Sequence, residues 1–417
     1  MKLIGPFTQI ATMNNLPEKG ALHDDLLEVI ANGGVLVDGE RIADVDEYDV
    51  LARKHPGADR EYLGGNHVLL PGFIDCHTHI CFAGSRAQDY SLRLSGVSYI
   101  DIAKRGGGIQ DTVRATRSAT RQELAELTAM RAQKVLHQGV TTIEVKSGYG
   151  LSKEEEIKIL YAIRDAAAIS VADIVPTCLA AHLKPSDFDG TEREYLEYVV
   201  NEIFPVLKEE KLSNRIDIFI EESAFNLEGS RWFLQEASRF GFEITVHADQ
   251  FSTGGSELAV QAGALSAEHL EASGDREIQL LAQSGTVATI LPGASLGLGM
   301  CFAPARKLLD AGCCVAIASD WNPGSAPMGD LLTQAALLGA YQKLTLTECL
   351  AGMTVRAAKA LSLKERGIVG KGFLADMQAY PTGDYRDVFY LQGSMKPNVV
   401  WKRGARVMPV ANDSFGS

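Results

Sequence analysis

Runs of β-branched and other apolar residues recur along the central part of the chain. Each run is followed by a polar loop and then by a segment with the periodicity of an amphipathic helix. We expect strands at residues 68–75, 139–146, 174–182, 216–222, 242–249, 262–269, 286–292 and 314–320. Helical patterns such as residues 154–168 and 230–240 lie between most of them. Near-continuous apolar strands are typical of a parallel sheet covered on both faces, so the pattern predicts an α/β fold, a (β/α)8 TIM-like barrel.

The two ends of the chain have a different pattern, with short apolar runs next to glycine. These runs are residues 34–39, 41–45, 367–376, 377–380 and 399–403. We expect both ends to pair into one small composite β-sandwich beside the barrel. The predicted organisation is therefore residues 1–66 and 367–417 for the composite β-sandwich and residues 67–366 for the barrel.

Composition and charge restrict the classes of function. Of the 417 residues, 46% are hydrophobic and 22% are charged, which suits a large core and excludes disorder. The formal net charge of −13 disfavours nucleic acid as a partner. Neither a signal-peptide pattern nor a run of roughly 18 apolar residues is present. We expect a cytoplasmic protein that binds neither nucleic acid nor membrane, and a homodimer is the expected oligomeric state.

Reactive side chains fall at the carboxyl ends of the predicted strands. In a (β/α)8 barrel these ends converge on one mouth, where catalysis occurs. In chain order the residues are Asp75, His77, His79, Lys146, Tyr149, His182, Glu221, Glu222, His247, His269 and Asp320. Any one of these histidines could be a structural residue of the core, but the set as a whole predicts an active site.

The pair His77 and His79 indicates a metal ion. Side chains alternate along a strand, so both imidazoles lie on the same side and can share one divalent cation. Nitrogen from His247 and a carboxylate from Asp320 would complete a site suited to zinc or iron, with a position left for water. Such an ion lowers the pKa of bound water toward about 7. The proton of that water needs an acceptor, and the residues leave open whether Asp320 or His269 is this catalytic base or whether His269 stabilises an oxyanion.

Several motifs resemble those of a known family. The segment Pro-Gly-Phe-Ile-Asp-Cys-His-Thr-His at residues 71–79, with Gly-Phe-Leu-Ala-Asp at residues 372–376, resembles the amidohydrolase superfamily. Further segments resemble the imidazolonepropionase family in particular. They are residues 82–86, 106–109, 112–117, 144–151, 247–250, 264–269 and 319–324.

The resemblance implies a specific chemistry and a set of site residues. One divalent metal ion, zinc or iron, would be held by His77, His79, His247 and Asp320. The small-molecule substrate would be 4-imidazolone-5-propanoate, whose cyclic amide is hydrolysed to N-formimidoyl-L-glutamate in histidine degradation. The implied substrate contacts are Arg86, Tyr149, His182, Gln250, Asn322, Gly324 and Ser325. Arg86 offers a fork of donors that suits a propionate carboxylate.

Two features depart from the family pattern, and two alternative functions stay open. Gln250 stands where some members carry Glu, so here the side chain can only hydrogen-bond the substrate. Residues 294–300 lack the aromatic residues expected beside the barrel mouth. A deaminase of an aminated heterocycle, such as guanine deaminase, would share barrel and metal but release ammonia. A non-catalytic barrel scaffold would bind no metal. The glycines at 106–108 favour a loop that closes over the site rather than a nucleotide-binding loop, and a plain flexible linker is the alternative.

Overall fold

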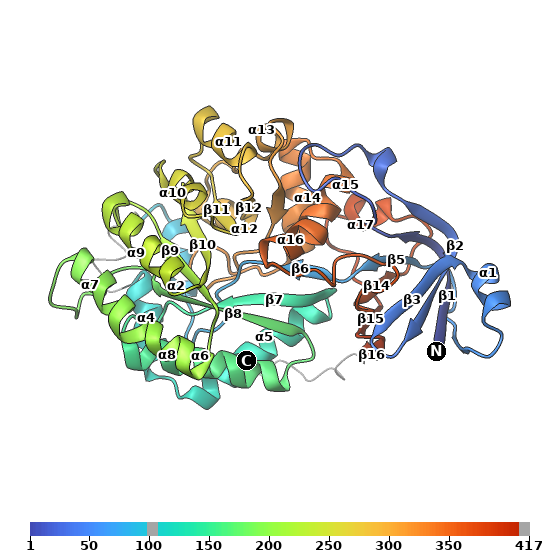
Figure 1. Cartoon of the computed structure of the whole chain (residues 1–417), viewed down its shortest axis with the longest axis horizontal. Helices are drawn as coiled ribbons and strands as arrows, with labels where there is room; N and C mark the ends of the chain where they lie inside the picture. Colours follow the sequence, from blue (N-terminus) through green and yellow to red (C-terminus); the bar gives the residue numbers. More distant parts are fainter. Residues whose placement is uncertain (98–106, 408–417) are drawn as a thin grey trace.

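Eight parallel strands form one sheet in the computed structural model, which describes residues 1–97 and 107–407 (Figure 1). Each strand pairs with the next one in the chain. The strands are β6 (Phe73–Asp75), β7 (Val140–Lys146), β8 (Asp173–Ala181), β9 (Arg215–Phe219), β10 (Glu243–Ala248), β11 (Ser266–His269), β12 (Val287–Ile290) and β13 (Val315–Ile317). Between β13 and β6, Ser319 N donates to Asp75 Oδ1 at 2.9 Å, and Thr78 forms a parallel bridge with Trp321. These contacts close the seam, and the predicted barrel is confirmed.

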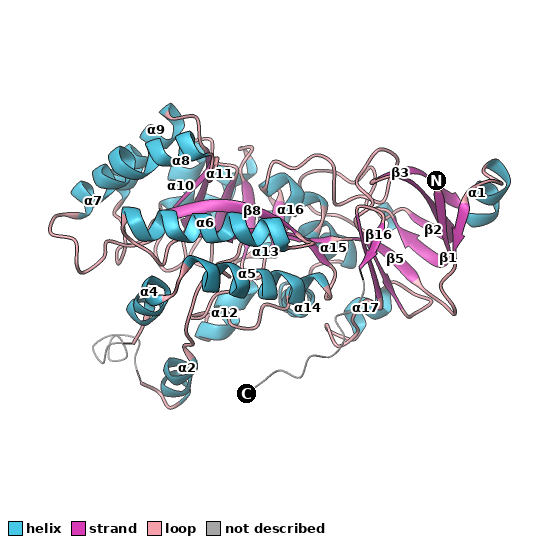
Figure 2. Ribbon diagram, turned by 90° about the horizontal axis from the view of Figure 1, so that it is seen from below, coloured by secondary structure: helices cyan, strands magenta, loops and turns pink. Residues whose placement is uncertain are grey.

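Helices surround this barrel (Figure 2). Several begin at a side chain that accepts an otherwise unpaired backbone N–H, as Ser152 does for Glu155 N and Asn226 does for Gly229 N. The helices around the barrel are α2 (Ala87–Leu94), α4 (Ile109–Ser118), α5 (Arg121–Leu136), α6 (Lys153–Ile169), α7 (Glu192–Tyr198), α8 (Phe204–Glu210), α9 (Leu227–Arg239), α10 (Gly255–Gln261), α11 (Asp275–Ala282), α12 (Pro292–Leu298), α13 (Ala305–Asp310), α14 (Leu331–Gln342), α15 (Leu346–Met353) and α16 (Val355–Ala360). The predicted helices at 154–168 and 230–240 correspond to α6 and α9. None of the described helices has the length and apolarity required to cross a membrane.

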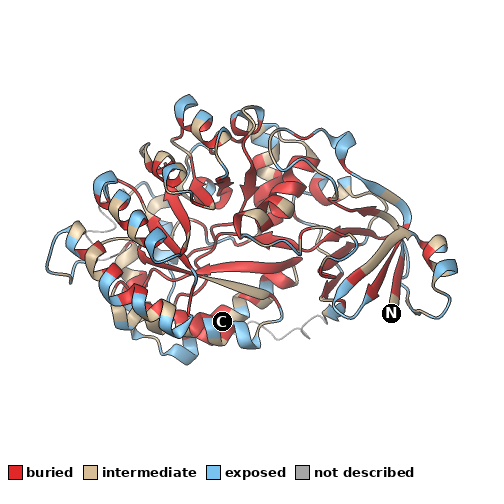
Figure 3. Cartoon of the chain, in the orientation of Figure 1, coloured by how far each residue is buried: buried red, intermediate tan, exposed pale blue. Residues whose placement is uncertain are grey.

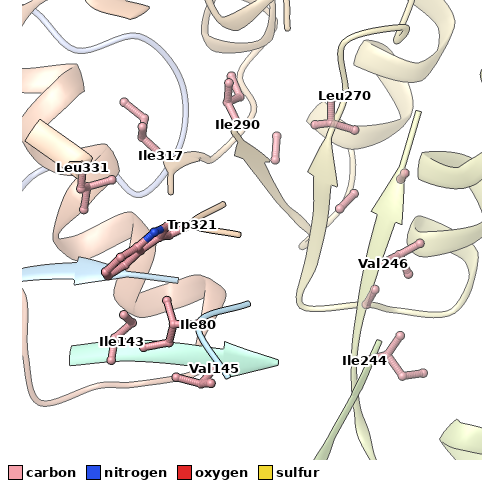
Figure 4. Close-up of a cluster of buried hydrophobic side chains, with 14 of the residues drawn as sticks. Ile80, Ile143, Val145, Ile244, Val246, Leu270, Ile290, Ile317, Trp321 and Leu331 are labelled. Carbon is pink, nitrogen blue, oxygen red and sulfur yellow. The ribbon is translucent and has the colours of Figure 1, made fainter. Parts of the chain in front are cut away.

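The barrel strands are mostly buried, except for the first four residues of β8, but their two faces differ in polarity (Figure 3). Ile143 and Val145 of β7 and Val246 of β10 belong to the apolar core beneath the helices (Figure 4). The intervening Glu144 and Lys146 point the other way, into the barrel, where they meet acids of other strands. The prediction of buried parallel strands holds. The barrel interior near the mouth is nevertheless polar, which the description of near-continuous apolar strands did not anticipate.

The predicted first barrel strand at residues 68–75 is wrong as a single strand. β5 (Val68–Pro71) pairs with strands from both chain ends, and only β6 belongs to the barrel. The chain passes from one sheet to the other at Gly72, where a Cβ would lie 2.3 Å from Thr141 Oγ1. No side chain fits there, so glycine is required at the change of direction.

The remaining strands form a second sheet, which joins the two ends of the chain. Its order is β16-β15-β14-β5-β1-β2-β3, with β4 beside β1, and the sheet carries the short helices α1 (Tyr48–Lys54) and α17 (Arg386–Tyr390) at its margins. The additional strands are β1 (Lys2–Ala11), β2 (Val29–Asp38), β3 (Arg41–Glu47), β4 (Asp59–Glu61), β14 (Met377–Tyr380), β15 (Val399–Lys402) and β16 (Ala405–Val407). The composite structure of both termini is confirmed.

The core of the second sheet requires the sheet to fold over itself. Phe7 of β1 and Trp401 of β15 pack edge to face with ring centroids 6.1 Å apart. Two strands separate β1 from β15 in the sheet, and adjacent strands lie about 4.8 Å apart, so a flat sheet would keep these rings much farther from each other. The fold thus encloses an apolar core of its own.

A buried ion pair network connects the second sheet to the barrel. Lys402 Nζ lies 2.6 Å from Asp376 Oδ2 and 2.9 Å from Asp173 Oδ2, at the start of β8. Arg366 binds the same Asp173 oxygen at 2.5 Å. These charges lie away from the carboxyl ends of the strands, so the network stabilises the junction and takes no part in the site at the mouth.

Candidate metal centre

Three imidazoles and one carboxylate meet at the carboxyl ends of the barrel strands. His79 Nε2 lies 3.2 Å from His77 Nε2 and 3.2 Å from His247 Nε2. Asp320 Oδ1 lies 3.4 Å from the Nε2 atoms of both His77 and His79. All four side chains are almost fully buried. The folded chain therefore brings together the four residues that the sequence predicted as metal ligands.

The geometry and protonation of these groups fit one divalent ion. Ligand atoms about 2.0–2.2 Å from one tetrahedral ion lie about 3.3–3.6 Å from each other, close to the separations seen here. Burial lowers the pKa of His77 and His79 well below the ordinary value and lowers that of His247 to about 3, so the imidazoles are neutral donors. Asp320 Oδ1 has no hydrogen-bond donor among the described residues. A buried carboxylate oxygen without a partner is costly, and a cation would satisfy it.

Buried acids fix the orientation of two of these imidazoles. His77 Nδ1 lies 2.5 Å from Glu268 Oε2, and His247 Nδ1 lies 2.9 Å from Asp217 Oδ2. A carboxylate that accepts from Nδ1 leaves Nε2 without a proton and free to bind a metal. The sequence analysis missed Asp217 and Glu268 as site residues. The sequence did contain a signal for them, because each is an acid within a segment predicted to be a buried barrel strand.

The backbone at the strand ends is unusual. The φ angles of Asp249, His269 and Asp320 are 53°, 82° and 51°. Residues other than glycine rarely adopt this left-handed conformation, and such strain gathers at functional sites. In each case the chain turns sharply as it leaves a barrel strand, and this turn directs the side chains of His269 and Asp320 toward the mouth.

The two catalytic candidates have different electrostatic surroundings. Burial raises the pKa of Asp320 to about 6, so the carboxyl group is largely ionised at neutral pH. Burial opposes the charged form of His269, but Glu271, with Oε2 3.5 Å from His269 Nδ1, raises the pKa of this imidazole above its ordinary value. The ring of His269 lies 5.3 Å from that of His247, measured between centroids. Asp320 is thus suited to accept a proton, and His269 to donate a hydrogen bond.

Aromatic residues line one side of the metal ligands. The ring of His182 stacks on His79 with centroids 5.6 Å apart, and Tyr149 lies 5.7 Å from His182 and 6.1 Å from His79. His182 Nδ1 donates to the Gly148 carbonyl at 2.9 Å, so Nε2 is an acceptor. Gln250 follows β10 and is buried as well. These three predicted substrate contacts therefore lie beside or just beyond the strand ends that carry the metal ligands.

Asn322 holds the loop of residues 320–325 on another side of the site. Its Oδ1 accepts from the backbone N–H groups of Gly324 and Ser325, both at 2.8 Å, and its Nδ2 donates to the Asp320 carbonyl at 2.7 Å. Ser325 Oγ in turn donates to Asp320 Oδ2 at 3.3 Å. The backbone amides that we expected to contact a ligand thus have a partner inside the loop, and Asn322 shapes this wall.

Arg86 reaches the same loop from the start of α2. A Cβ on Gly324 would lie 3.4 Å from Arg86 Nη1, and the side chain of Arg86 is only 9% exposed. Arg86 Nε donates to Asp89 Oδ2 at 2.5 Å, and Asp89 also accepts from Gly108 N at 2.8 Å. Arg86 is therefore a partly buried residue that lies against the loop of residues 320–325. Of the glycine-rich segment expected to close over the site, Gly106 lies outside the described residues.

The segment without aromatic residues contacts this wall too. Residues 292–298 form the short helix α12, and a Cβ on Gly297 would lie 1.6 Å from the Ser325 carbonyl oxygen. A larger side chain at position 297 would displace residues 322–326. Through this contact between Gly297 and Ser325, the segment of residues 294–300 influences the shape of the loop beside Asp320.

Comparison with known proteins agrees with this site. Residues 68–407 match the model of the amidohydrolase family, so the chain is an amidohydrolase, the class that barrel and ligand set define. Residues 33–58 match the bacterial imidazolonepropionase-like composite domain. An imidazolonepropionase of Deinococcus deserti is 42% identical over 82% of this chain and 85% of the relative, and one of Symbiobacterium thermophilum is 39% identical over 96% and 95%. The chain belongs to the imidazolonepropionase family.

Solved structures share the fold at low sequence identity. Atrazine chlorohydrolase from Arthrobacter aurescens TC1, complexed with zinc, superposes with a TM-score of 0.71 at 17% identity over 99% of this chain and 97% of that chain. An adenosine deaminase from Xanthomonas campestris with bound zinc superposes with a TM-score of 0.68 at 16% identity, over 97% and 92%. At these identities the likeness establishes the architecture of barrel and composite sheet.

Proposed function

We propose that this protein hydrolyses the cyclic amide of 4-imidazolone-5-propanoate to N-formimidoyl-L-glutamate. In this reaction water adds to the ring carbonyl, the C–N bond breaks, and the ring nitrogen receives a proton. The proposal depends above all on one observation, the convergence of three neutral imidazoles and Asp320 at a barrel mouth that also carries Arg86. Relatives named imidazolonepropionase at about two-fifths identity support the choice of substrate.

The residues that would hold the metal are His77, His79, His247 and Asp320. Three nitrogens and one oxygen are a donor set suited to zinc or iron. Such an ion, when bound, makes a coordinated water more acidic and polarises a carbonyl group. The protein contributes a buried site in which acids against Nδ1 of His77 and His247 favour an unprotonated Nε2 on both imidazoles.

Two side chains would move the protons of the reaction. The Asp320 carboxylate is the group best suited to take a proton from water and deliver it to the leaving ring nitrogen, because its pKa of about 6 lies just below neutrality. His269, whose pKa Glu271 raises against the effect of burial, is suited to stabilise the negative oxygen that develops on the carbonyl. Of the two candidates that the sequence leaves open, we therefore propose Asp320 as the base.

The substrate would lie between two walls of the site. Arg86 presents its Nη groups, since its Nε is already bound to Asp89, and these suit the propionate carboxylate. Tyr149 and the unprotonated Nε2 of His182 would contact the ring from the opposite wall. Gln250 would add a hydrogen bond, and the loop ordered by Asn322 would close the carboxylate end.

Turnover of the proposed substrate is the decisive experiment. Purified protein supplied with zinc or with ferrous iron should convert 4-imidazolone-5-propanoate to N-formimidoyl-L-glutamate, detected by mass spectrometry. Asp320→Asn should abolish this conversion while the protein still melts cooperatively. Release of ammonia from guanine without ring opening of the imidazolone would establish the deaminase alternative. Absence of both activities and of bound metal by elemental analysis would establish the scaffold.

A further inference from the structure

A buried lysine lies directly beneath the three imidazoles. Lys146 Nζ is 2.7 Å from Glu144 Oε1, 2.8 Å from Asp217 Oδ2 and 3.2 Å from Glu268 Oε2. The side chains of the lysine and the three acids are at most 1% exposed. They come from β7, β9 and β11, so the ammonium ties together three strands at one level of the barrel. None of these four residues contacts the substrate in the function proposed above.

Two of the three oxygens around the lysine also lie against metal ligands. Asp217 Oδ2 lies 2.8 Å from Lys146 Nζ and 2.9 Å from His247 Nδ1, and Glu268 Oε2 lies 3.2 Å from Lys146 Nζ and 2.5 Å from His77 Nδ1. Each carboxylate oxygen thus joins the ammonium to one imidazole. A change in the lysine would act on two ligands at once.

The third acid, Glu144, contacts the backbone between two of the predicted metal ligands. Glu144 Oε2 accepts from Thr78 N at 3.3 Å, and Thr78 Oγ1 donates to the Glu144 carbonyl at 2.6 Å. Thr78 lies between His77 and His79, so the backbone that carries both imidazoles is fixed to β7. Each of the three acids around the lysine therefore contacts either a predicted metal ligand or the residue between two such ligands.

The acids need a cation at this place. Ligand atoms of Asp217, His247 and Glu268 all lie within 4.8 Å of one another, a spacing that could itself hold a metal ion. Buried carboxylates that share a small volume repel each other unless a positive charge lies between them. The lysine ammonium supplies that charge, and it leaves the Nε2 face of the imidazoles as the place for the metal.

We propose that Lys146 is a positioning residue of the metal centre. Its ammonium holds Asp217 and Glu268 in the places from which they accept the Nδ1 protons of His247 and His77, so that both imidazoles present Nε2 to one cation. The inference rests on the proposed metal site, but it concerns metal affinity and not the choice of substrate.

Two variants of the full-length protein test this role. Lys146→Met removes the ammonium alone. The double variant Glu144→Gln with Lys146→Met removes one charge of each sign, so the buried group keeps its net charge, and the Gln oxygen can still accept from Thr78 N. The dissociation constant for Zn2+ is measured by competition with a chromophoric chelator, on protein whose near-ultraviolet circular dichroism shows native packing. Loss of the partners that orient metal ligands typically weakens metal binding about 10- to 100-fold, and we expect a rise of that size in both variants.

Lys402→Met is the matched control. Lys402 is likewise a buried lysine bound by carboxylates, those of Asp173 and Asp376, but it lies at the junction with the second sheet. This variant should lower the melting temperature and leave the Zn2+ dissociation constant within about twofold of the parent value, the precision of such a titration and well below the change typical for lost ligand partners.

The possible outcomes separate the role of Lys146 from the proposed substrate. A Zn2+ dissociation constant in the double variant within twofold of the parent would overturn the role of Lys146. Tight Zn2+ binding by the parent without ring opening would refute the proposed substrate, while the ratio of dissociation constants would still judge Lys146. A parent protein that binds no divalent metal would overturn both proposals.

Discussion

Replacement of Arg86 tests whether the site recognises a carboxylate. Arg86→Met removes a guanidinium whose Nε is bound to Asp89 and whose Nη groups form no hydrogen bond with the residues that the structure describes. A hydrogen bond to a charged group contributes about 1.5–3 kcal/mol. Since about 1.4 kcal/mol corresponds to a factor of ten, loss of one such contact should lower kcat/KM about 10- to 150-fold. Asp89 keeps its bond from Gly108 N, so the fold should tolerate the change.

The assay compares two substrates on each variant. One is 4-imidazolone-5-propanoate, and the other is the same ring with an ethyl group in place of the propionate. Arg86→Met should lose its activity on the charged substrate only, which brings the two kcat/KM values together. Arg93→Met serves as control, because Arg93 Nη2 donates to the Gly324 carbonyl of the same loop at 2.8 Å without a proposed ligand contact. An equal loss on both substrates in Arg86→Met would refute the carboxylate role.

Three further predictions concern stability and the site wall. Lys402→Met breaks a buried ion pair and should lower the free energy of unfolding by about 3–5 kcal/mol. An unfolding entropy of about 2.1 cal/mol/K per residue gives about 0.9 kcal/mol/K for the 417 residues, so the melting temperature should fall by about 3–6 °C. Lys54→Met, at an exposed ion pair, should change the melting temperature by about 1 °C or less. Gly297→Ala should raise KM for the imidazolone severalfold because the added Cβ meets the Ser325 carbonyl oxygen. Gly285→Ala, where the added Cβ has open space around it, should leave KM unchanged. Equal KM values for the two variants would contradict the effect of this contact. Chelation of the metal should stop turnover. Zn2+ at about 100 times its dissociation constant should raise the melting temperature by about 3 °C, because the ion binds the folded protein only. An unchanged melting temperature would argue against a metal site in the folded protein.

Much of the architecture was readable from the chain. Eight apolar runs separated by helical patterns specify a barrel because hydrophobic periodicity depends on local geometry alone. The positions of His77, His79, His247 and Asp320 could be inferred for a related reason. All parallel strands of a barrel end at the same rim, so residues at strand ends converge even when the register between strands is unknown.

Interactions between strands were beyond the reach of this reasoning. The sequence identifies Lys146, Asp217 and Glu268 as charged residues inside strands, but it does not say that one ammonium contacts both acids. That depends on the register and tilt of β7, β9 and β11, which long-range packing sets. The division of residues 68–75 into β5 and β6 has the same origin, because Gly72 is required by a contact with Thr141 on a neighbouring strand.

The sequence by itself determined the kind of fold and the atoms available for chemistry, because both follow from the order of residue types along strands and helices. The tertiary structure alone decided how those atoms are held. Asn322 orders the loop beside Asp320, and buried acids lie against the Nδ1 atoms of His77 and His247. The contacts of His77 with Glu268 and of His247 with Asp217 join residues far apart in the chain, and only the packed barrel brings these atoms within reach.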